Sequence, residues 1–365
     1  MKKITIQLKI SILFNEEKNK MQPYKVDIPV YLNFFCRPDT FQYVFNAVRE
    51  ARPSMLFLSC DGARENRKDD EQNIKKCQEI AEQIDWECTV YKNYSEKNLG
   101  CGMRMYTGIS WAFEYVDRLI ILEDDCVPSQ DCFIFFEELL EKYLNDERIN
   151  MICGMNNIGT WDKNGTSYFF AKTGSCWGWA TWKRAWKNVE YDMPYMEDKN
   201  VRRLFRKSVT PKGYGDKLLK LGDYRYAEFQ NIGKLSAWTF QHGMSRWLNS
   251  QLIIVPARNM ITNVGLTGDS THALNDIRKL PKATQRLFNM EIYPLEFPLI
   301  HPKYIIDDAD YAHNVGIVMG GVGIQKYLQR IEGIVRRIIF SEKGEIGKAI
   351  KRKIGRWWNE NKRKY

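Results

Sequence analysis

The first 154 residues alternate short apolar segments with segments of helical periodicity, and this alternation constrains the fold more than any other feature of the chain. The apolar segments have the length of strands and lie at residues 26–35, 55–59, 87–91, 118–122 and 151–154. Apolar residues at three- and four-residue steps predict helices at residues 39–51, 69–84, 103–114 and 131–143. Strands joined through helices pair in parallel. The sequence therefore predicts an α/β fold with a doubly wound, mostly parallel sheet.

One predicted strand stops at three consecutive carboxylates, Glu123, Asp124 and Asp125. The carboxyl ends of parallel strands are where open α/β folds bind ligands. Adjacent carboxylates repel one another unless a cation lies among them, and oxygen ligands suit Mg²⁺ or Mn²⁺. One hypothesis is therefore a divalent-metal site that holds a diphosphate. The alternative is a strand-to-turn junction whose acids are solvated.

The other predicted strands also end in polar or glycine-rich segments, at Arg37, at residues 61–64 and at residues 97–102. Because parallel strands share one carboxyl edge, these segments are expected to meet the acids in one crevice. The glycines at 100 and 102 belong to neither a P-loop nor a dinucleotide fingerprint, which disfavours kinase-type and dehydrogenase functions. Taken alone, they are also compatible with a simple turn before a helix.

Composition places the chain among globular proteins, with 365 residues and 44% hydrophobic residues. No apolar run reaches the roughly 18 residues that span a bilayer, and residues 1–20 show no secretion signal, so we expect a cytoplasmic protein. The 9 cysteines include no Cys-x-x-Cys pair and no zinc-type spacing. They are expected to be reduced thiols.

The positive charge is concentrated at the C-terminus. Residues 325–365 contain 13 Lys or Arg and 4 Glu, which is +9 of the net +10. Isoleucines and tryptophans recur there at helical steps, which predicts a pair of amphipathic helices broken near residues 341–347. Basic residues beside Ile and Trp are typical of segments that lie on anionic membranes. The alternative is a helix pair packed on its own domain; no motif indicates nucleic-acid binding.

Several motifs in order resemble one enzyme class. The segments at residues 36–39, 60–64, 98–102 and 120–126 are similar to the nucleotide-sugar half of GT-A glycosyltransferases, in particular bacterial family 2-type enzymes and the N-acetylglucosaminyltransferase I group. Residues 177–182 and 256–272 resemble the acceptor half of those bacterial proteins. The resemblance covers residues 26–275. It implies a GT-A type sheet with an acceptor-side extension, followed here by the C-terminal amphipathic helices.

The resemblance also implies roles for single residues. Asp125 would ligate Mn²⁺ through the diphosphate, with Glu123 supporting it, and His272 would be a second metal or phosphate contact or a hydrogen-bonded loop histidine. The residues expected to contact the nucleotide sugar are Arg37, Asp61, Asn98, Gly100, Gly102 and Asp124.

The acceptor half departs from this pattern at the catalytic base. Related enzymes usually carry an acid beside a tryptophan where this chain has residues 236–241, which contain none. Asp223, Glu228 and His242 are the nearby candidates, and Glu228 is expected first because a helix over residues 223–229 would present it toward the crevice. Trp177 and Trp179 either stack on a sugar or pack in the core.

These expectations define four parts: an arm at 1–25, a nucleotide-sugar half at 26–155, an acceptor half at 156–324 and a basic tail at 325–365. The expected protein is a metal-dependent, inverting glycosyltransferase that uses a UDP-type sugar and a glycan or lipid-linked acceptor. It would lie on the inner face of the membrane through its tail. The alternatives are a sugar nucleotidyltransferase, which releases pyrophosphate, and a non-catalytic binder of sugar or nucleotide at the membrane surface.

Overall fold

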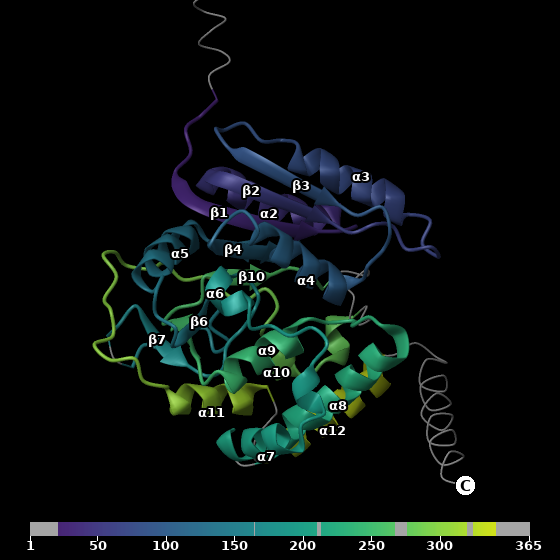
Figure 1. Cartoon of the computed structure of the whole chain (residues 1–365), viewed down its shortest axis with the longest axis vertical. Helices are drawn as coiled ribbons and strands as arrows, with labels where there is room; N and C mark the ends of the chain where they lie inside the picture. The colour runs from purple at the N-terminus through teal and green to yellow at the C-terminus, as the bar shows by residue number, and fades with distance from the viewer. Residues whose placement is uncertain (1–20, 164, 210–212, 267–275, 320–323, 341–365) are drawn as a thin grey trace, which may run out of the picture.

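A mixed sheet with helices on both faces organises the chain (Figure 1). The structure, a computed structural model, describes residues 21–163, 165–209, 213–266, 276–319 and 324–340. The strands are β1 (Val26–Phe34), β2 (Pro53–Cys60), β3 (Thr89–Tyr94), β4 (Arg118–Glu123), β5 (Cys126–Pro128), β6 (Ile149–Cys153), β7 (Tyr168–Ala171), β8 (Trp179–Trp182), β9 (Leu252–Pro256) and β10 (Ile261–Asn263).

The helices follow the order expected for a wound sheet in the first half and form a separate group in the second. They are α2 (Pro38–Ala51), α3 (Asp70–Ala81), α4 (Cys101–Ala112), α5 (Gln130–Lys142), α6 (Lys183–Trp186), α7 (Lys199–Ser208), α8 (Tyr214–Ile232), α9 (Thr239–Leu248), α10 (Lys282–Gln285), α11 (Ala309–Val318) and α12 (Gln325–Phe340). Two short 3₁₀ turns lie at Pro194–Met196 and Ile277–Lys279.

The main sheet has eight strands in the order β3-β2-β1-β4-β8-β6-β9-β7. Strands β3, β2, β1 and β4 pair in parallel, and Tyr31 lies opposite both Phe57 and Ile121. Strand β8 is antiparallel to both β4 and β6, and β7 is antiparallel to β9. The predicted doubly wound, mostly parallel α/β sheet is confirmed.

Successive side chains along a strand point to opposite faces of the sheet and pack into two different apolar cores. Val30 and Leu32 of β1 join one apolar cluster with side chains of α2, α3 and α5. Tyr31, between them, belongs to a second cluster with side chains of α4 on the opposite face. A third, smaller cluster joins α7, α8 and α9. The nearly continuous apolar strands are therefore explained by burial on both faces of the sheet.

The boundaries of several elements differ from the sequence prediction by two or three residues, among them those of β3 and α4. Strand β3 covers Thr89–Tyr94 rather than residues 87–91, and as an edge strand it is half-exposed, so its apolar pattern is weak. Helix α4 begins at Cys101 rather than at residue 103, because Gly100 takes a positive φ of 81° and turns the chain into the helix. Strands β5, β7, β9 and β10 were not predicted.

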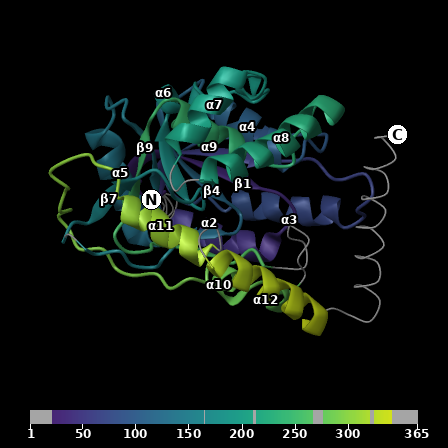
Figure 2. The same cartoon turned by 90° about the horizontal axis from the view of Figure 1, so that it is seen from below.

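The C-terminal elements lie along one side of the body. Figure 2 shows α11 and α12 following one another across this surface. Helix α12 corresponds to the first predicted tail helix, whereas the second helix and the predicted break lie outside the described residues, as do residues 1–20 of the predicted arm. Among the described residues, no helix is long and apolar enough to cross a membrane.

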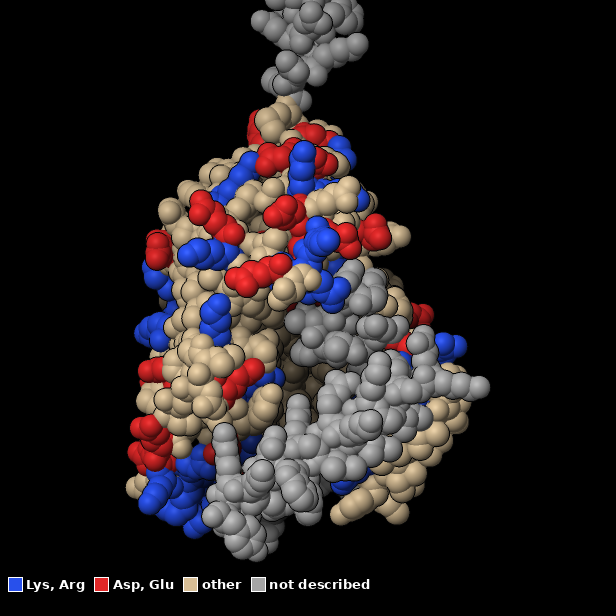
Figure 3. Space-filling model, turned by 90° about the vertical axis from the view of Figure 1, so that its right-hand side faces the viewer, with Lys and Arg blue, Asp and Glu red and all other residues tan. Residues whose placement is uncertain are grey.

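One face of the molecule is hollowed at its centre, and Lys and Arg are interspersed there with Asp and Glu over the upper part of the body (Figure 3). This mixture agrees with the near-neutral charge of the chain outside its tail. The 9 cysteines, all within the described part of the chain, form no disulfide.

Candidate functional site

Two neighbouring cavities open at the carboxyl edge of the parallel strands. The smaller, of about 150 Å³, is lined by residues that follow β1, β2 and β4 and by the segment before α4. The larger, of about 540 Å³, extends from β4 to α9 and to the segments at residues 174–177 and 263–266. Arg37, Cys101 and Glu123 line both cavities, so these residues mark the junction between them.

Asp61 organises one wall of the smaller cavity. Its Oδ1 accepts hydrogen bonds from the backbone amides of Gly62 and Leu99, at 3.0 and 2.9 Å, and its Oδ2 accepts one from Gly100 at 2.9 Å. Burial raises the pKa of Asp61, although these three amide donors oppose the shift. The carboxylate thus fixes the loop that leads into α4. Asn98 reinforces the same loop by donating to the carbonyl of Gly62 at 2.8 Å.

Gly102 is required by a close approach of two chain segments. A Cβ at this position would lie 2.2 Å from the carbonyl oxygen of Leu235. The start of α4 therefore packs directly against the segment that leads into α9, and residues of both line the larger cavity. Gly102 itself lines neither cavity, whereas Gly100 lines the smaller one.

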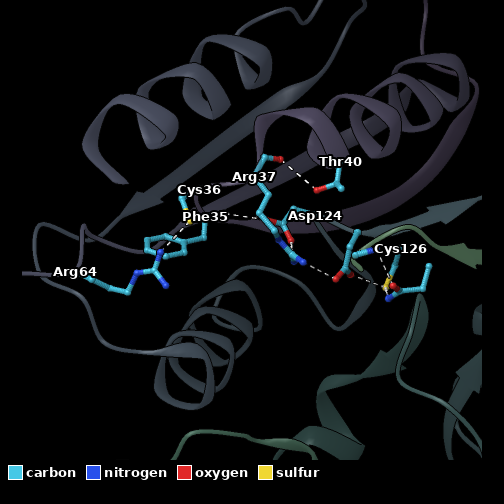
Figure 4. A network of polar contacts seen from close by, with 10 residues as sticks. Phe35, Cys36, Arg37, Thr40, Arg64, Asp124 and Cys126 are labelled. Carbon is cyan, nitrogen blue, oxygen red and sulfur yellow. Dashed lines mark hydrogen bonds and ion pairs between the residues drawn. The ribbon is translucent and has the colours of Figure 1, made fainter. Parts of the chain in front are cut away.

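Arg37 lies among the strand-end acids (Figure 4). Its Nη1 donates to Asp125 Oδ2 at 2.9 Å, and its Nη2 forms an ion pair with Asp124. Asp124 also accepts a hydrogen bond from the backbone amide of Phe35 at 3.2 Å. Burial alone would lower the pKa of Arg37, but the adjacent Asp124 and Asp125 raise it. The positive charge that the three acids require is thus partly supplied by the chain itself, which the sequence reasoning missed.

Glu123 and Asp125 are the acids exposed to the larger cavity. Burial, together with the neighbouring Asp125 and Asp124, raises the pKa of Glu123 to about 8. Asp125 is held by Arg37, and its backbone carbonyl accepts from Val264 at 2.9 Å. A Cβ on Gly265 would lie 2.1 Å from Asp125 Oδ2, so a glycine there leaves room for this carboxylate.

The donor set fits a divalent cation only in part. Within the described residues, no group of three His, Cys, Asp or Glu is arranged to hold a metal. Asp125 and Glu123 offer carboxylate oxygens, which suit Mg²⁺ or Mn²⁺, and such ions usually take further oxygens from water and substrate phosphates. His272, the expected additional contact, lies outside the described residues. A cation here would thus depend on the substrate for several ligands.

The two tryptophans proposed to contact a sugar have different surroundings. Trp177 lines the larger cavity, and its ring packs 5.1 Å from that of Phe288. Trp179 is fully buried in the sheet and stacks at 5.4 Å on Trp238, which does line this cavity. The structure therefore brings Trp177 and Trp238, but not Trp179, to the cavity wall.

The three candidate bases are also dispersed. Asp223 is exposed and pairs with Arg202 at 2.7 Å, and it lines neither cavity. Glu228 pairs with Arg225 at 2.9 Å; burial alone would raise its pKa, but hydrogen bonds with Arg225 and Ser236 lower it. Arg225 and Ser236 line the larger cavity, whereas Glu228 does not.

His242 is the candidate base that lines the larger cavity. Its ring is buried among Trp179, Trp186 and Trp238, with ring centroids 4.7 to 5.9 Å away. Burial, with a smaller effect of Arg246, lowers the pKa of His242 to about 3. Its imidazole is therefore neutral at pH 7, able to accept a hydrogen bond but a weak proton acceptor.

Several cavity residues had no signal in the sequence. Arg104 lines the smaller cavity, where its Nε donates to Ser59 at 2.9 Å and its Nη2 to the Asn93 side chain at 3.0 Å. Arg225 and Arg246 line the larger cavity. Each comes from a helix whose polar residues are compatible with a solvated face, so sequence periodicity alone does not distinguish them.

Comparisons with known proteins do not show a family. No protein-family model matches the chain, and no curated protein matches it in sequence. Among solved structures, it is similar to the crystal structure of 4-diphosphocytidyl-2C-methyl-D-erythritol synthase from Anaerococcus prevotii, with 13% sequence identity and a TM-score of 0.29. The match covers 54% of this chain and 83% of that enzyme. A match this weak supports no functional inference.

Proposed function

We propose that this protein transfers a sugar from a nucleoside-diphosphate sugar, of the UDP type, to a hydroxyl group of an acceptor. The observation that supports this best is the pair of cavities that meet at Arg37 and Glu123. A nucleoside in the smaller cavity would place its diphosphate at this junction. The transferred sugar and the acceptor would then occupy the larger cavity. The motifs that resemble GT-A glycosyltransferases line the same two cavities.

The residues at the junction suit a leaving diphosphate. Negative charge builds up on it as the bond to the sugar breaks, and fixed positive groups stabilise that charge. Arg37 supplies a guanidinium there, and Asp61 holds the neighbouring loop in place through three backbone amides. A divalent cation bound to Asp125 and Glu123 would add Lewis-acid stabilisation of the same charge.

The larger cavity suits the acceptor side of the reaction. Trp177 and Trp238 offer flat apolar surfaces of the kind on which sugar rings pack. The neutral His242 can accept a hydrogen bond from an acceptor hydroxyl and thereby orient it. We place His242 ahead of Glu228 and Asp223 among the candidate groups, because the two carboxylates are ion-paired and line neither cavity.

We further infer that α12 attaches the protein to an anionic membrane surface, where a lipid-linked acceptor would be found. Six aliphatic side chains of this helix are between 45% and 64% exposed: Leu328, Ile331, Ile334, Val335, Ile338 and Ile339. Exposed Arg330 and Arg337 lie on the same helix. An exposed apolar stripe beside basic residues is the pattern of helices that lie in the membrane interface.

The test is to incubate the full chain with a panel of nucleotide sugars and Mn²⁺ and to identify the released product. Release of a nucleoside diphosphate, abolished by a chelator, is the expected result. A parallel reaction supplies nucleoside triphosphates and sugar phosphates with Mn²⁺, and release of pyrophosphate there would instead assign a nucleotidyltransferase. Binding of nucleotide sugars with neither product, in the presence of candidate acceptors, would leave a binding protein and contradict the proposal.

A further inference from the structure

Arg246, on α9, is a cavity residue whose charge lacks a carboxylate partner within the described part of the chain. It lines the larger cavity. Its Nη1 contacts the sulfur of Met151 at 3.6 Å, which is a weak interaction, and its buried Nε has no hydrogen-bond partner among the described residues. A buried guanidinium normally pairs with an acid or with several carbonyls, so this environment is incomplete.

The other arginines that line the two cavities have conventional polar partners among the described residues. Arg37 pairs with Asp124 and Asp125, and Arg225 pairs with Glu228. Arg64, beside the smaller cavity, forms a two-point contact with Asp70 at 2.6 Å for each bond. Arg104 has no acid partner either, but it donates to Ser59 and to Asn93. Within the described part of the chain, Arg246 is thus the cavity arginine that has neither an acid nor an oxygen acceptor.

The groups around Arg246 are neutral at pH 7. They include Cys153, Cys176, Tyr214 and His242. Burial raises the pKa of both cysteines to about 12, and that of His242 is lowered to about 3, so none of these three is charged. Burial also lowers the pKa of Arg246 itself, and no carboxylate among the described residues opposes this shift. An anion entering the cavity would supply the missing charge.

We propose that the acceptor carries an anionic group, a carboxylate or a phosphate, and that Arg246 binds this group in the larger cavity. This inference rests on the proposed function. A guanidinium presents parallel N–H groups that match the oxygens of either group. Trp177 and Trp238 line the same cavity and would face the sugar ring that carries the anion. The diphosphate of the donor would be held at the junction by Arg37, whereas Arg246 lines the larger cavity and not the smaller one.

The test compares binding of three sugars to the full chain by calorimetry: methyl glucuronide, glucose 6-phosphate and neutral methyl glucoside. Wild type is expected to bind at least one acidic sugar about tenfold more tightly than the neutral one, the size of effect given by a hydrogen bond to a charged group. The stronger of the two acidic ligands identifies carboxylate or phosphate. Arg246→Met should remove the preference, and Arg246→Lys should retain part of it.

Thermal unfolding provides the control for a structural role. Because Arg246→Met removes an uncompensated charge, its melting temperature should equal or exceed that of wild type. Arg184 is the matched control, since its guanidinium donates to the carbonyls of Tyr143, Leu144 and Ile149 at 2.7 to 2.8 Å. Arg184→Met should lower the melting temperature and leave sugar binding unchanged.

The outcomes separate this site from the proposed activity. Equal binding of acidic and neutral sugars by wild type, or an unchanged preference in Arg246→Met, overturns the anion site. A lower melting temperature for Arg246→Met, as for Arg184→Met, would also overturn it by showing a structural guanidinium. If nucleotide sugars are turned over without any preference for acidic sugars, the anion site alone fails. If acidic sugars bind without any turnover, the proposed function fails and the anion site stands.

Discussion

At the scale of single residues, the site is defined by how its charges are compensated. Arg37 connects the buried Asp124 with the partly buried Asp125 and so compensates part of their negative charge. Asp125 differs from Asp124 because it also faces the larger cavity, where a substrate can reach it. The two acids should therefore respond differently to substitution.

We predict that Asp125→Asn abolishes metal-dependent turnover of a nucleotide sugar and leaves the fold intact. The amide keeps the volume and polarity of the side chain but removes the charge that a cation requires. Product release with and without Mn²⁺ and the melting temperature measure the two effects. Asp85→Asn, in an exposed ion pair with Arg49, is the control and should change neither. Normal metal-dependent rates for Asp125→Asn would refute the metal assignment.

Substitutions at the three candidate groups of the acceptor side should have graded effects. We expect His242→Ala to lower kcat by on the order of 10²-fold, because loss of an orienting contact misplaces the acceptor hydroxyl. Glu228→Gln should have a smaller effect and Asp223→Asn almost none, since Asp223 is exposed and paired with Arg202. Donor affinity, measured with UDP, should not change in any of them. If only Glu228→Gln is inactive, Glu228 rather than His242 acts on the acceptor.

The burial of His242 predicts a specific pH dependence of stability. Its pKa is about 3 in the folded protein, below the value of 6.5 for an exposed histidine, so the unfolded chain binds the proton first as the pH falls. The neutral ring therefore makes its full contribution to the free energy of unfolding above pH 6.5. As the pH falls from 6.5 toward 3, the free energy of unfolding decreases by up to about 1.4 kcal/mol per pH unit. Urea unfolding of wild type and His242→Phe between pH 4 and 8 tests this. Equal acid sensitivity of both proteins would contradict it.

At the scale of elements, α12 is attached to the body along a narrow edge. Glu332 accepts a hydrogen bond from the backbone amide of Lys282 at 3.1 Å, and Arg336 donates to the carbonyl of Arg278 at 3.3 Å. The aliphatic side chains of the helix stay exposed. Polar contacts thus fix the position of the helix and leave its apolar stripe uncovered by the described residues.

We predict that Ile334→Glu combined with Ile338→Glu abolishes binding of the full chain to anionic vesicles and does not lower the melting temperature. Both side chains are more than half exposed, at 53% and 56%, so little packing is lost. Co-sedimentation with vesicles of anionic or neutral lipid measures binding, which salt should weaken. Leu204→Glu on α7, at an equally exposed position of 54%, is the matched control. A large loss of thermal stability in the double variant would instead show a packed structural helix.

At the scale of the whole molecule, the sequence predicted the parallel half of the sheet because β1, β2 and β4 are separate apolar runs that alternate with helices. Strand β3 fits the same alternation although its apolar pattern is weak. The spacing of the tryptophans around Trp179 and Ala180 of β8 suits a strand followed by a helix, but it does not indicate which strands β8 pairs with. The place of β8 between β4 and β6 follows from long-range pairing that local periodicity does not encode. Local periodicity also does not predict that Arg246 lacks an acid partner among the described residues, because this depends on which side chains surround it in the folded chain.

Within the candidate site, the sequence predicted which segments meet but not how their charges pair. The convergence of Arg37, Asp61, Asn98 and the strand-end acids follows from the parallel topology. In the structure these residues line the smaller cavity, except Asp125, which lines the adjoining larger cavity. The ion pair of Arg37 depends on side-chain geometry, and so does the distance of Glu228 from the cavity wall. Neither can be derived from spacing along the chain.

The eight-stranded sheet has a mechanical consequence. Strands β1 and β4 support the smaller cavity, and β6, β8 and β9, which come after the crevice motifs in the chain, extend the same hydrogen-bonded sheet without interruption. A continuous hydrogen-bonded sheet resists bending between its two halves, so the strands that end at the two cavities keep their positions relative to one another. Exclusion of water during the proposed transfer must then come from side chains and connecting segments that close over the crevice, and the frame that holds the reacting groups stays rigid throughout.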